Sequence, residues 1–94
     1  MLKIEKELNG DTLNIRIGGR LDTITSTDLE REIADFEGER IVFDCSDLDY
    51  ISSAGLRVFL TTHKRIGNMV LKNISETVHE ILDVTGFTDI LTIE

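Results

Sequence analysis

Residues 41–57 read IVFDCSDLDYISSAGLR, and they join an apolar run to a segment of small residues. The run Ile41–Phe43 is continuous instead of alternating, which is typical of a central strand covered on both faces. A polar loop at residues 46–50 then leads to a helix that we expect from about Ala54 to Ile66. A buried strand joined by a loop to a helix indicates an α/β fold, whose functional groups usually lie at the carboxyl ends of the strands.

The sequence before this stretch predicts a hairpin. Residues 2, 4, 6 and 8 (Leu, Ile, Lys and Leu) alternate with the charged residues 3, 5 and 7, and Leu13, Ile15 and Ile17 alternate with Asn14 and Arg16. This two-residue period is typical of a half-exposed strand. The tripeptide Asn9-Gly10-Asp11 separates the two segments and suits a tight turn, because Asn and Gly tolerate positive φ. The pair Gly18-Gly19 is expected to end the second strand.

The segment between this hairpin and residue 41 predicts the first helix. Candidate helix caps lie at Thr25–Asp28. The hydrophobic residues Leu29, Ile33 and Phe36 follow at spacings of four and three, so they share one face of a helix. We expect Gly38 to close this helix.

The last third of the chain continues the alternation. A short strand at residues 69–71, a third helix capped by Ser75 and a last strand at residues 90–93 are expected. Strands linked through a helix run parallel. The predicted fold is therefore α/β, a mixed and mostly parallel β-sheet of about five strands with an N-terminal hairpin and three or more helices packed on it. One domain of residues 1–94 is expected.

Composition argues against several classes of function. The formal net charge is -8 at pH 7, and such a field repels nucleic-acid phosphates and anionic lipids. The sequence contains no run of the ~18 apolar residues that a spanning helix needs. We therefore expect neither a nucleic acid nor a membrane as a partner.

A hydrolase site has little support. Ser53 and Gly55 match half of a nucleophile elbow, but Ile51 stands where that motif needs its first glycine. His63 lies roughly 15 Å further along the same helix, at 1.5 Å per residue, and His79 belongs to another helix. We expect no catalytic residue in this chain.

Metal and thiol chemistry are equally weak. Asp44, Asp47 and Asp49 do not have the spacing of a calcium loop, and its glycine is absent. The lone Cys45 lies in the apolar run and is expected to be a buried strand residue. The sequence therefore predicts no metal site and no cofactor.

Two hydroxyls stand where the second helix is expected to begin, Ser52 and Ser53, and the small residues Ala54 and Gly55 follow them. Serine is among the best N-caps, so capping alone accounts for one hydroxyl. We interpret the small residues as keeping the helix start open to a partner. The free N–H groups of a helix start tolerate an anion, whereas the charge of a phosphoserine is costly in a desolvated interface. The pattern thus permits a switch that alters binding without altering the fold.

The ordered motifs of the chain resemble the STAS domain family, specifically its small anti-sigma factor antagonists. The matching segments are Ile17–Asp22, Ile41–Asp44 with Leu48, Ile51–Arg57 and Leu82–Phe87. The resemblance implies a cytoplasmic bacterial signalling protein that regulates transcription by partner switching and is not an enzyme. Its implied partners are an anti-sigma factor with ATP-dependent serine kinase activity and a phosphoserine phosphatase.

The resemblance also implies site residues. The phosphorylated residue of the family lies two positions before the motif glycine, which makes it Ser53 here. Many relatives have Asp at the preceding position, so Ser52 is a rival acceptor, while Ala54 replaces a Ser or Thr and removes one. The implied partner-binding residues are Asp22, Ser52, Ser53, Ala54, Gly55, Leu56 and Arg57.

One alternative remains from a different class. Family members in transport or signalling complexes share the fold, so the chain could be a scaffold or sensor subunit that does not switch. Such a subunit would bind its partner whatever the state of Ser53.

Overall fold

The structure is a computed structural model that describes residues 2–94. Its five strands form one sheet in the order β1-β2-β3-β4-β5, with β1 antiparallel to β2 and every other neighbouring pair parallel. The predicted mixed, mostly parallel sheet with an N-terminal hairpin is confirmed. In chain order the elements are β1 (Lys3–Asn9), β2 (Thr12–Leu21), α1 (Thr23–Ile33), β3 (Arg40–Ile51), α2 (Ser53–Ile66), β4 (Met69–Lys72), α3 (Glu76–Val84), the short 3-10 helix η1 (Phe87–Asp89) and β5 (Thr92–Ile93).

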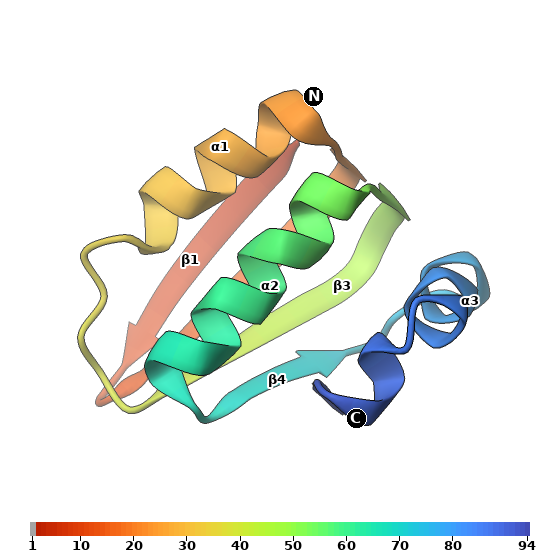
Figure 1. Cartoon of the computed structure of the whole chain (residues 1–94). Coiled ribbons are helices and arrows are strands. Elements are labelled where there is room, and N and C mark those ends of the chain that lie inside the picture. The colour runs from red at the N-terminus through yellow and green to blue at the C-terminus, as the bar shows by residue number, and fades with distance from the viewer. Residues whose placement is uncertain (1) are drawn as a thin grey trace.

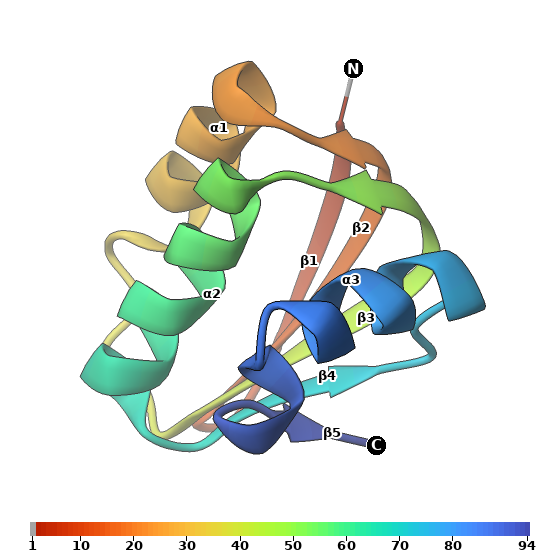
Figure 2. The same cartoon turned by 45° about the vertical axis from the view of Figure 1, so that its right-hand side comes forward.

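The helices α1, α2 and α3 cover one face of the sheet (Figures 1 and 2). The core lies between the two layers, where the rings of Phe43 on β3 and Phe59 on α2 stand 5.0 Å apart at an interplanar angle of 56°. The expected central, buried strand is confirmed, since Ile41, Val42 and Phe43 are all buried and β3 is the middle strand of the sheet, although the helices cover only one of its faces. Val42 points away from the helices, and it is buried because β3 has a strand on either side, with Asn14 and Val70 as its paired neighbours.

The opposite face of the sheet carries a row of charges in register. Glu5, Arg16, Asp44 and Lys72 are successive partners across the first four strands, so their signs alternate. Opposite charges on facing strands attract. Burial raises the pKa of Asp44, but hydrogen bonds from Asn73 and from the backbone and side chain of Ser46, together with the charge of Arg16, outweigh burial and leave that pKa below its ordinary value. The charged side chains of this row therefore face solvent.

The second and third strands are longer than the sequence predicts. Gly18 and Gly19 lie inside β2, and residues 46–50 belong to β3 and not to a loop. The pairing of these strands shifts register on either side of the glycine pair. A Cβ on Gly18 would stand 3.0 Å from the Cβ of Asp47, and Gly19 has a φ of +94°. The glycine pair therefore does not end β2. It allows an irregular pairing through which both β2 and β3 continue.

The first helix also begins and ends earlier than predicted. Its N-cap is Asp22, so the expected caps at Thr25–Asp28 lie inside the helix. Its last residue is Ile33, and Phe36 lies beyond the helix, after a turn at Ala34 and Asp35. The guanidinium of Arg65 on α2 donates to the carbonyl oxygens of Ile33 at 2.8 Å and Phe36 at 2.7 Å. These bonds satisfy carbonyls at the end of α1 that have no partner within the helix.

The remaining helices agree with the sequence. α2 begins at Ser53, one residue before the expected position, and Ser75 caps α3 by accepting a hydrogen bond from the Val78 N–H at 3.2 Å. The longest helix, α2, has 14 residues. Within residues 2–94, no helix combines the length and the apolar composition required to cross a membrane.

Candidate functional site

The candidate site lies at the carboxyl ends of β2 and β3, where α1 and α2 begin side by side (Figure 1). Leu21 and Ile51 are paired at the last positions of the two strands, and the N–H of Ser52 donates to the carbonyl oxygen of Leu21 at 2.9 Å. The chain leaves both strands at the same edge of the sheet. The two helix starts are therefore held next to each other by backbone pairing.

Ser52 is the N-cap of α2. Its backbone is extended, with φ -97° and ψ 176°, and its Oγ accepts from the N–H of Gly55 at 3.4 Å. Its carbonyl oxygen accepts from the N–H of Leu56 at 3.0 Å, the first bond of the helix. The side chain is half-buried. The hydroxyl of Ser52 is thus oriented toward the helix that it caps.

Ser53 is the first residue of α2, and it is exposed. The first turn of a helix has N–H groups without intrahelical acceptors, and the partial positive charge there favours an anion. No acidic residue lies in the first turn of α2. The hydroxyl of Ser53 is accessible to an enzyme, in a place where a negative group is tolerated.

Gly55 is buried, and its role differs from the one expected. A Cβ at this position would stand 2.8 Å from Cγ of Leu21 and 2.8 Å from Cγ1 of Ile51. The glycine therefore lets α2 approach the ends of β2 and β3, and it does not keep the helix start open to a partner. Leu56 is only 5% exposed and belongs to the core. Gly55 and Leu56 therefore hold α2 in position beneath the exposed residues of the site, and neither contributes a side chain to the surface.

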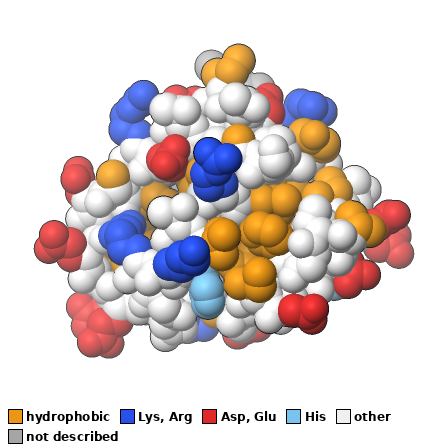
Figure 3. Space-filling model, in the orientation of Figure 1, with side chains coloured by type: hydrophobic (Ala, Val, Ile, Leu, Met, Phe, Trp, Pro, Cys, Tyr) orange, Lys and Arg blue, Asp and Glu red, His pale blue; other side chains and the backbone are white. Residues whose placement is uncertain are grey.

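Ala54 is half-buried beside Ser53, and Arg57 is exposed one turn further along α2. None of the ion pairs within residues 2–94 includes Arg57. The helix carries Arg57, Lys64 and Arg65 and no acidic residue, although the whole chain is acidic. Basic side chains accordingly stand over α1 and α2, while most acidic ones lie at the margin of this face (Figure 3).

Asp22 lies at the same edge as the N-cap of α1. Its Oδ1 accepts from the N–H groups of Thr25 at 3.0 Å and Ile24 at 3.1 Å, and its own N–H donates to Oγ1 of Thr25 at 2.8 Å. The hydrogen bonds from the backbone and the side chain of Thr25 are the main causes that lower the pKa of Asp22. This acidic residue thus stabilises the start of α1, whatever else it contacts.

Two features of this edge were not identified from the sequence. Ile24, in the first turn of α1, is 80% exposed. The sequence could have predicted this exposure, because Ile24 lies outside the helical spacing of the buried residues Thr25, Leu29 and Ile33. The second is the guanidinium of Arg20, which stacks 4.3 Å from the ring centre of Tyr50. This contact required the pairing of Arg20 with Tyr50, which the unexpected extension of both strands creates.

The groups considered for catalysis lie elsewhere. His63 is half-buried on α2, with a buried Nδ1 that has no hydrogen-bond partner among residues 2–94, and His79 is exposed on α3. Burial raises the pKa of the Cys45 thiol to about 12, so the thiol stays protonated. In the described chain, no three His, Cys, Asp or Glu side chains gather as a metal site would require.

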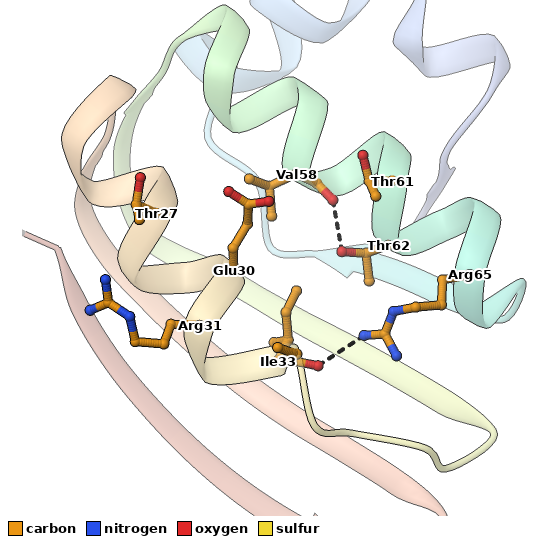
Figure 4. A pocket seen from close by; sticks show the side chains of 9 residues that line it. Thr27, Glu30, Arg31, Ile33, Val58, Thr61, Thr62 and Arg65 are labelled. Atoms are coloured by element: carbon orange, nitrogen blue, oxygen red, sulfur yellow. Dashed lines mark hydrogen bonds between the residues drawn. The ribbon is translucent and has the colours of Figure 1, made fainter.

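A groove of about 470 Å³ runs between α1 and α2 below the helix starts (Figure 4). Most of the surface that lines it is apolar. The groove ends at Arg65, whose hydrogen bond to Ile33 joins the two helices. The lining residues are Thr27, Glu30, Arg31, Ile33, Ala34, Val58, Thr61, Thr62 and Arg65. None of the residues expected at the site lines this groove.

Comparison with known proteins identifies the family. Residues 3–94 match the STAS domain. BtrV of Bordetella bronchiseptica, provisionally named an anti-sigma factor antagonist, is 37% identical over 80% of this chain and 71% of its own length. The anti-sigma F factor antagonist of Paenibacillus polymyxa is 32% identical over 98% of this chain and 86% of its own length.

Solved structures agree in fold. Unphosphorylated SpoIIAA, an anti-sigma factor antagonist, matches with a TM-score of 0.83 at 21% identity, over 98% of this chain and 88% of its own. SpoIIAA of Bacillus in its phosphorylated form matches with a TM-score of 0.75 at 18% identity, over 98% and 91% of the two chains. Because the family model matches nearly the whole length of the sequence, this chain belongs to the STAS domain family, among relatives that are anti-sigma factor antagonists.

Proposed function

We propose that the chain is an anti-sigma factor antagonist that acts by partner switching. In its unphosphorylated form it binds an anti-sigma factor that is also an ATP-dependent serine kinase, and the sigma factor is released. Phosphorylation of Ser53 breaks this complex, and a phosphoserine phosphatase restores the binding form. The chain catalyses neither step, and it acts in the cytoplasm, where sigma factors work.

The observation that carries the proposal is the contrast between two adjacent hydroxyls. Ser53 is exposed at the start of α2, whereas Ser52 is half-buried and oriented as the N-cap. A kinase must reach its acceptor, and a phosphate needs a site that tolerates its charge, so Ser53 is the better acceptor. The relatives support the same function by name, and SpoIIAA is known in both phosphorylation states.

The covalent step is an ordinary phosphoryl transfer. The Oγ of Ser53 forms a bond to the γ-phosphorus of ATP while the bond from that phosphorus to the bridging oxygen breaks, and ADP leaves. The hydroxyl proton passes to a base of the kinase or to water. The phosphatase reverses the modification by hydrolysis, which releases inorganic phosphate.

The proposed interface lies at the edge where α1 and α2 begin. Asp22, Ser52, Ser53, Ala54 and Arg57 reach its surface, while Gly55 and Leu56 hold α2 in place beneath it. A phosphate adds about -1.5 to -2 charges there. Removing that charge from water costs several kcal/mol unless the partner pairs it. About 3–5 kcal/mol of differential affinity is enough to convert a mostly bound population into a mostly free one.

Phosphopeptide mapping with a matched pair of variants tests the acceptor. The wild-type chain and the variants Ser53→Ala and Ser52→Ala are incubated with ATP and the anti-sigma factor kinase encoded in the same genome. We expect label in the peptide at Ser53 for wild type and Ser52→Ala, and none for Ser53→Ala. Label that persists in Ser53→Ala, or that maps to Ser52, contradicts the assignment.

A pull-down separates the switch from the scaffold that does not switch. Wild type, Ser53→Ala and Ser53→Asp are compared for recovery of the same kinase. Because Ala preserves the charge of the surface and Asp adds to it, we expect full recovery with Ser53→Ala and reduced recovery with Ser53→Asp. Equal recovery with all three chains favours the scaffold.

A further inference from the structure

An arginine without a counter-ion lies one helical turn from the proposed phosphorylation site. Ser53 and Arg57 are four residues apart on α2, and both are exposed. Residues at this spacing have Cβ atoms about 5–6 Å apart on the same face of a helix. None of the five ion pairs within residues 2–94 contains Arg57. Its guanidinium is therefore free to bind a new anion nearby.

The order of the two residues favours contact. An acidic group N-terminal to a basic one at this spacing is the better orientation on a helix. The Cα–Cβ bonds of a helix tilt toward its N-terminus, so the side chain of Arg57 leans back toward Ser53. The first turn of α2 contains no acidic residue that would compete for the guanidinium. The other cation near this edge, Arg20, already stacks on Tyr50.

We propose that Arg57 is the intramolecular counter-ion of phosphorylated Ser53, so that the modification occupies a cation which the unmodified chain offers to its partner. This inference rests on the proposed function. The planar guanidinium of Arg57 can donate two hydrogen bonds to the phosphate oxygens, while the N–H groups of the helix start face the same phosphate.

The pairing gives phosphorylation two effects at one surface. It adds negative charge at Ser53, and it withdraws the positive charge of Arg57 from any carboxylate of the partner. An added charge alone would leave Arg57 available to the partner. Because Ser53 and Arg57 lie on the same face of α2, their pairing requires a rotation of the Arg57 side chain and no change of fold.

Phosphorus NMR of the chain itself tests the contact without kinase or partner. Phosphoserine is incorporated at position 53 during translation, and the second ionisation of the phosphate, ordinarily near pH 6, is followed in wild type, Arg57→Gln and Lys64→Gln. Lys64 is an exposed cation on the same helix, about 16 Å from Ser53 along the axis. Its substitution removes the same charge at a distance beyond the Debye length of ~10 Å at 0.1 M salt.

In 0.1 M salt we expect the phosphate to titrate about 0.3–0.7 pH units higher in Arg57→Gln than in wild type, because exposed ion pairs are of this strength. Lys64→Gln should titrate like wild type, and the difference should shrink in 1 M salt. Equal titration of Arg57→Gln and wild type would overturn the inference. If the proposed function is wrong, the pull-down shows no binding or the phosphopeptide mapping finds label at another residue. Neither outcome changes the titration measured here.

Discussion

The backbone N–H of Ser52 donates to the carbonyl oxygen of Leu21 at 2.9 Å. This bond continues the pairing of β2 with β3 one residue beyond the last matched pair, Leu21 with Ile51. It ties the N-cap of α2 to the residue that precedes Asp22, the N-cap of α1. The exposed hydroxyl of Ser53 is therefore presented by the sheet and both helices, and not by a loose loop.

The glycine at position 55 is predicted to be required for packing. Gly55→Ala places a Cβ 2.8 Å from side-chain atoms of Leu21 and Ile51, and overpacking of this kind costs about 1–3 kcal/mol. The better helix propensity of Ala returns about 0.5–1 kcal/mol. We expect a net loss of about 0.5–2 kcal/mol in the free energy of unfolding, measured by urea denaturation.

A double-mutant cycle with Leu21→Ala controls for this interpretation. Removing the Leu21 side chain relieves part of the crowding, so Gly55→Ala should cost less in that background than in wild type. If the cost is the same in both backgrounds, contact with Leu21 does not explain the glycine.

The carboxylate of Asp22 is predicted to act through its capping bonds. Asn is as good an N-cap as Asp, whereas Ala is poor. We expect Asp22→Ala to lower the urea midpoint and Asp22→Asn to leave it close to wild type at pH 7. Comparing the two variants in the partner pull-down then separates the charge of Asp22 from its capping, because only Asn retains the cap.

The same carboxylate predicts a dependence of stability on pH. Hydrogen bonds from Thr25 lower the folded-state pKa of Asp22 below its ordinary value of 3.8. A group with a lowered folded pKa stabilises the fold above its unfolded pKa, and this contribution is lost as the pH falls through the folded pKa. We expect Asp22→Asn to lose less stability than wild type between pH 5 and pH 2 (an interval of about 3 units). A steeper loss in the variant would contradict the capping geometry.

Arg65 is predicted to join α1 to α2 through two carbonyl oxygens, those of Ile33 and Phe36. Arg65→Met keeps much of the apolar stem but removes the donors, so it should lower the free energy of unfolding by about 1–2 kcal/mol. Amide exchange should accelerate around the end of α1. Lys64→Met, at an exposed neighbouring position, is the control and should change stability by less than about 0.5 kcal/mol.

The thiol of Cys45 is predicted to be inert in the native chain. It is buried, and its pKa is raised to about 12, so almost no thiolate forms at pH 8. A disulfide reagent should label it at least about 1000-fold more slowly in the native chain than in guanidinium, since labelling requires opening of the core. Rapid labelling of native protein would show that β3 is accessible at this point.

Periodicity predicted the order of elements correctly because each helix has one apolar face and each buried strand a compact apolar run. It failed where pairing overrides local sequence. The polar residues 46–50 are typical of a loop, and Gly18-Gly19 of a strand end, yet each segment extends its strand because the other lies beside it in an irregular ladder. Neither segment alone contains that information.

The candidate site was predicted less completely. The motif placed Ser53 at the start of α2, and the structure exposes it there. Local sequence could not reveal that Asp22 caps α1, because Thr25 and Ser26 are equally good caps when judged by residue type. The role of Gly55 depends on Leu21, a residue 34 positions away in the chain, so only the folded structure provides it.

The affinity of the phosphorylated chain for its anti-sigma factor tests the proposed switch most directly. Chain with phosphoserine at position 53 and unmodified chain are titrated by calorimetry into the same kinase, without ATP. We predict that phosphorylation weakens binding at least about 150-fold, which corresponds to about 3 kcal/mol. Equal dissociation constants for the two forms would contradict the proposed switch.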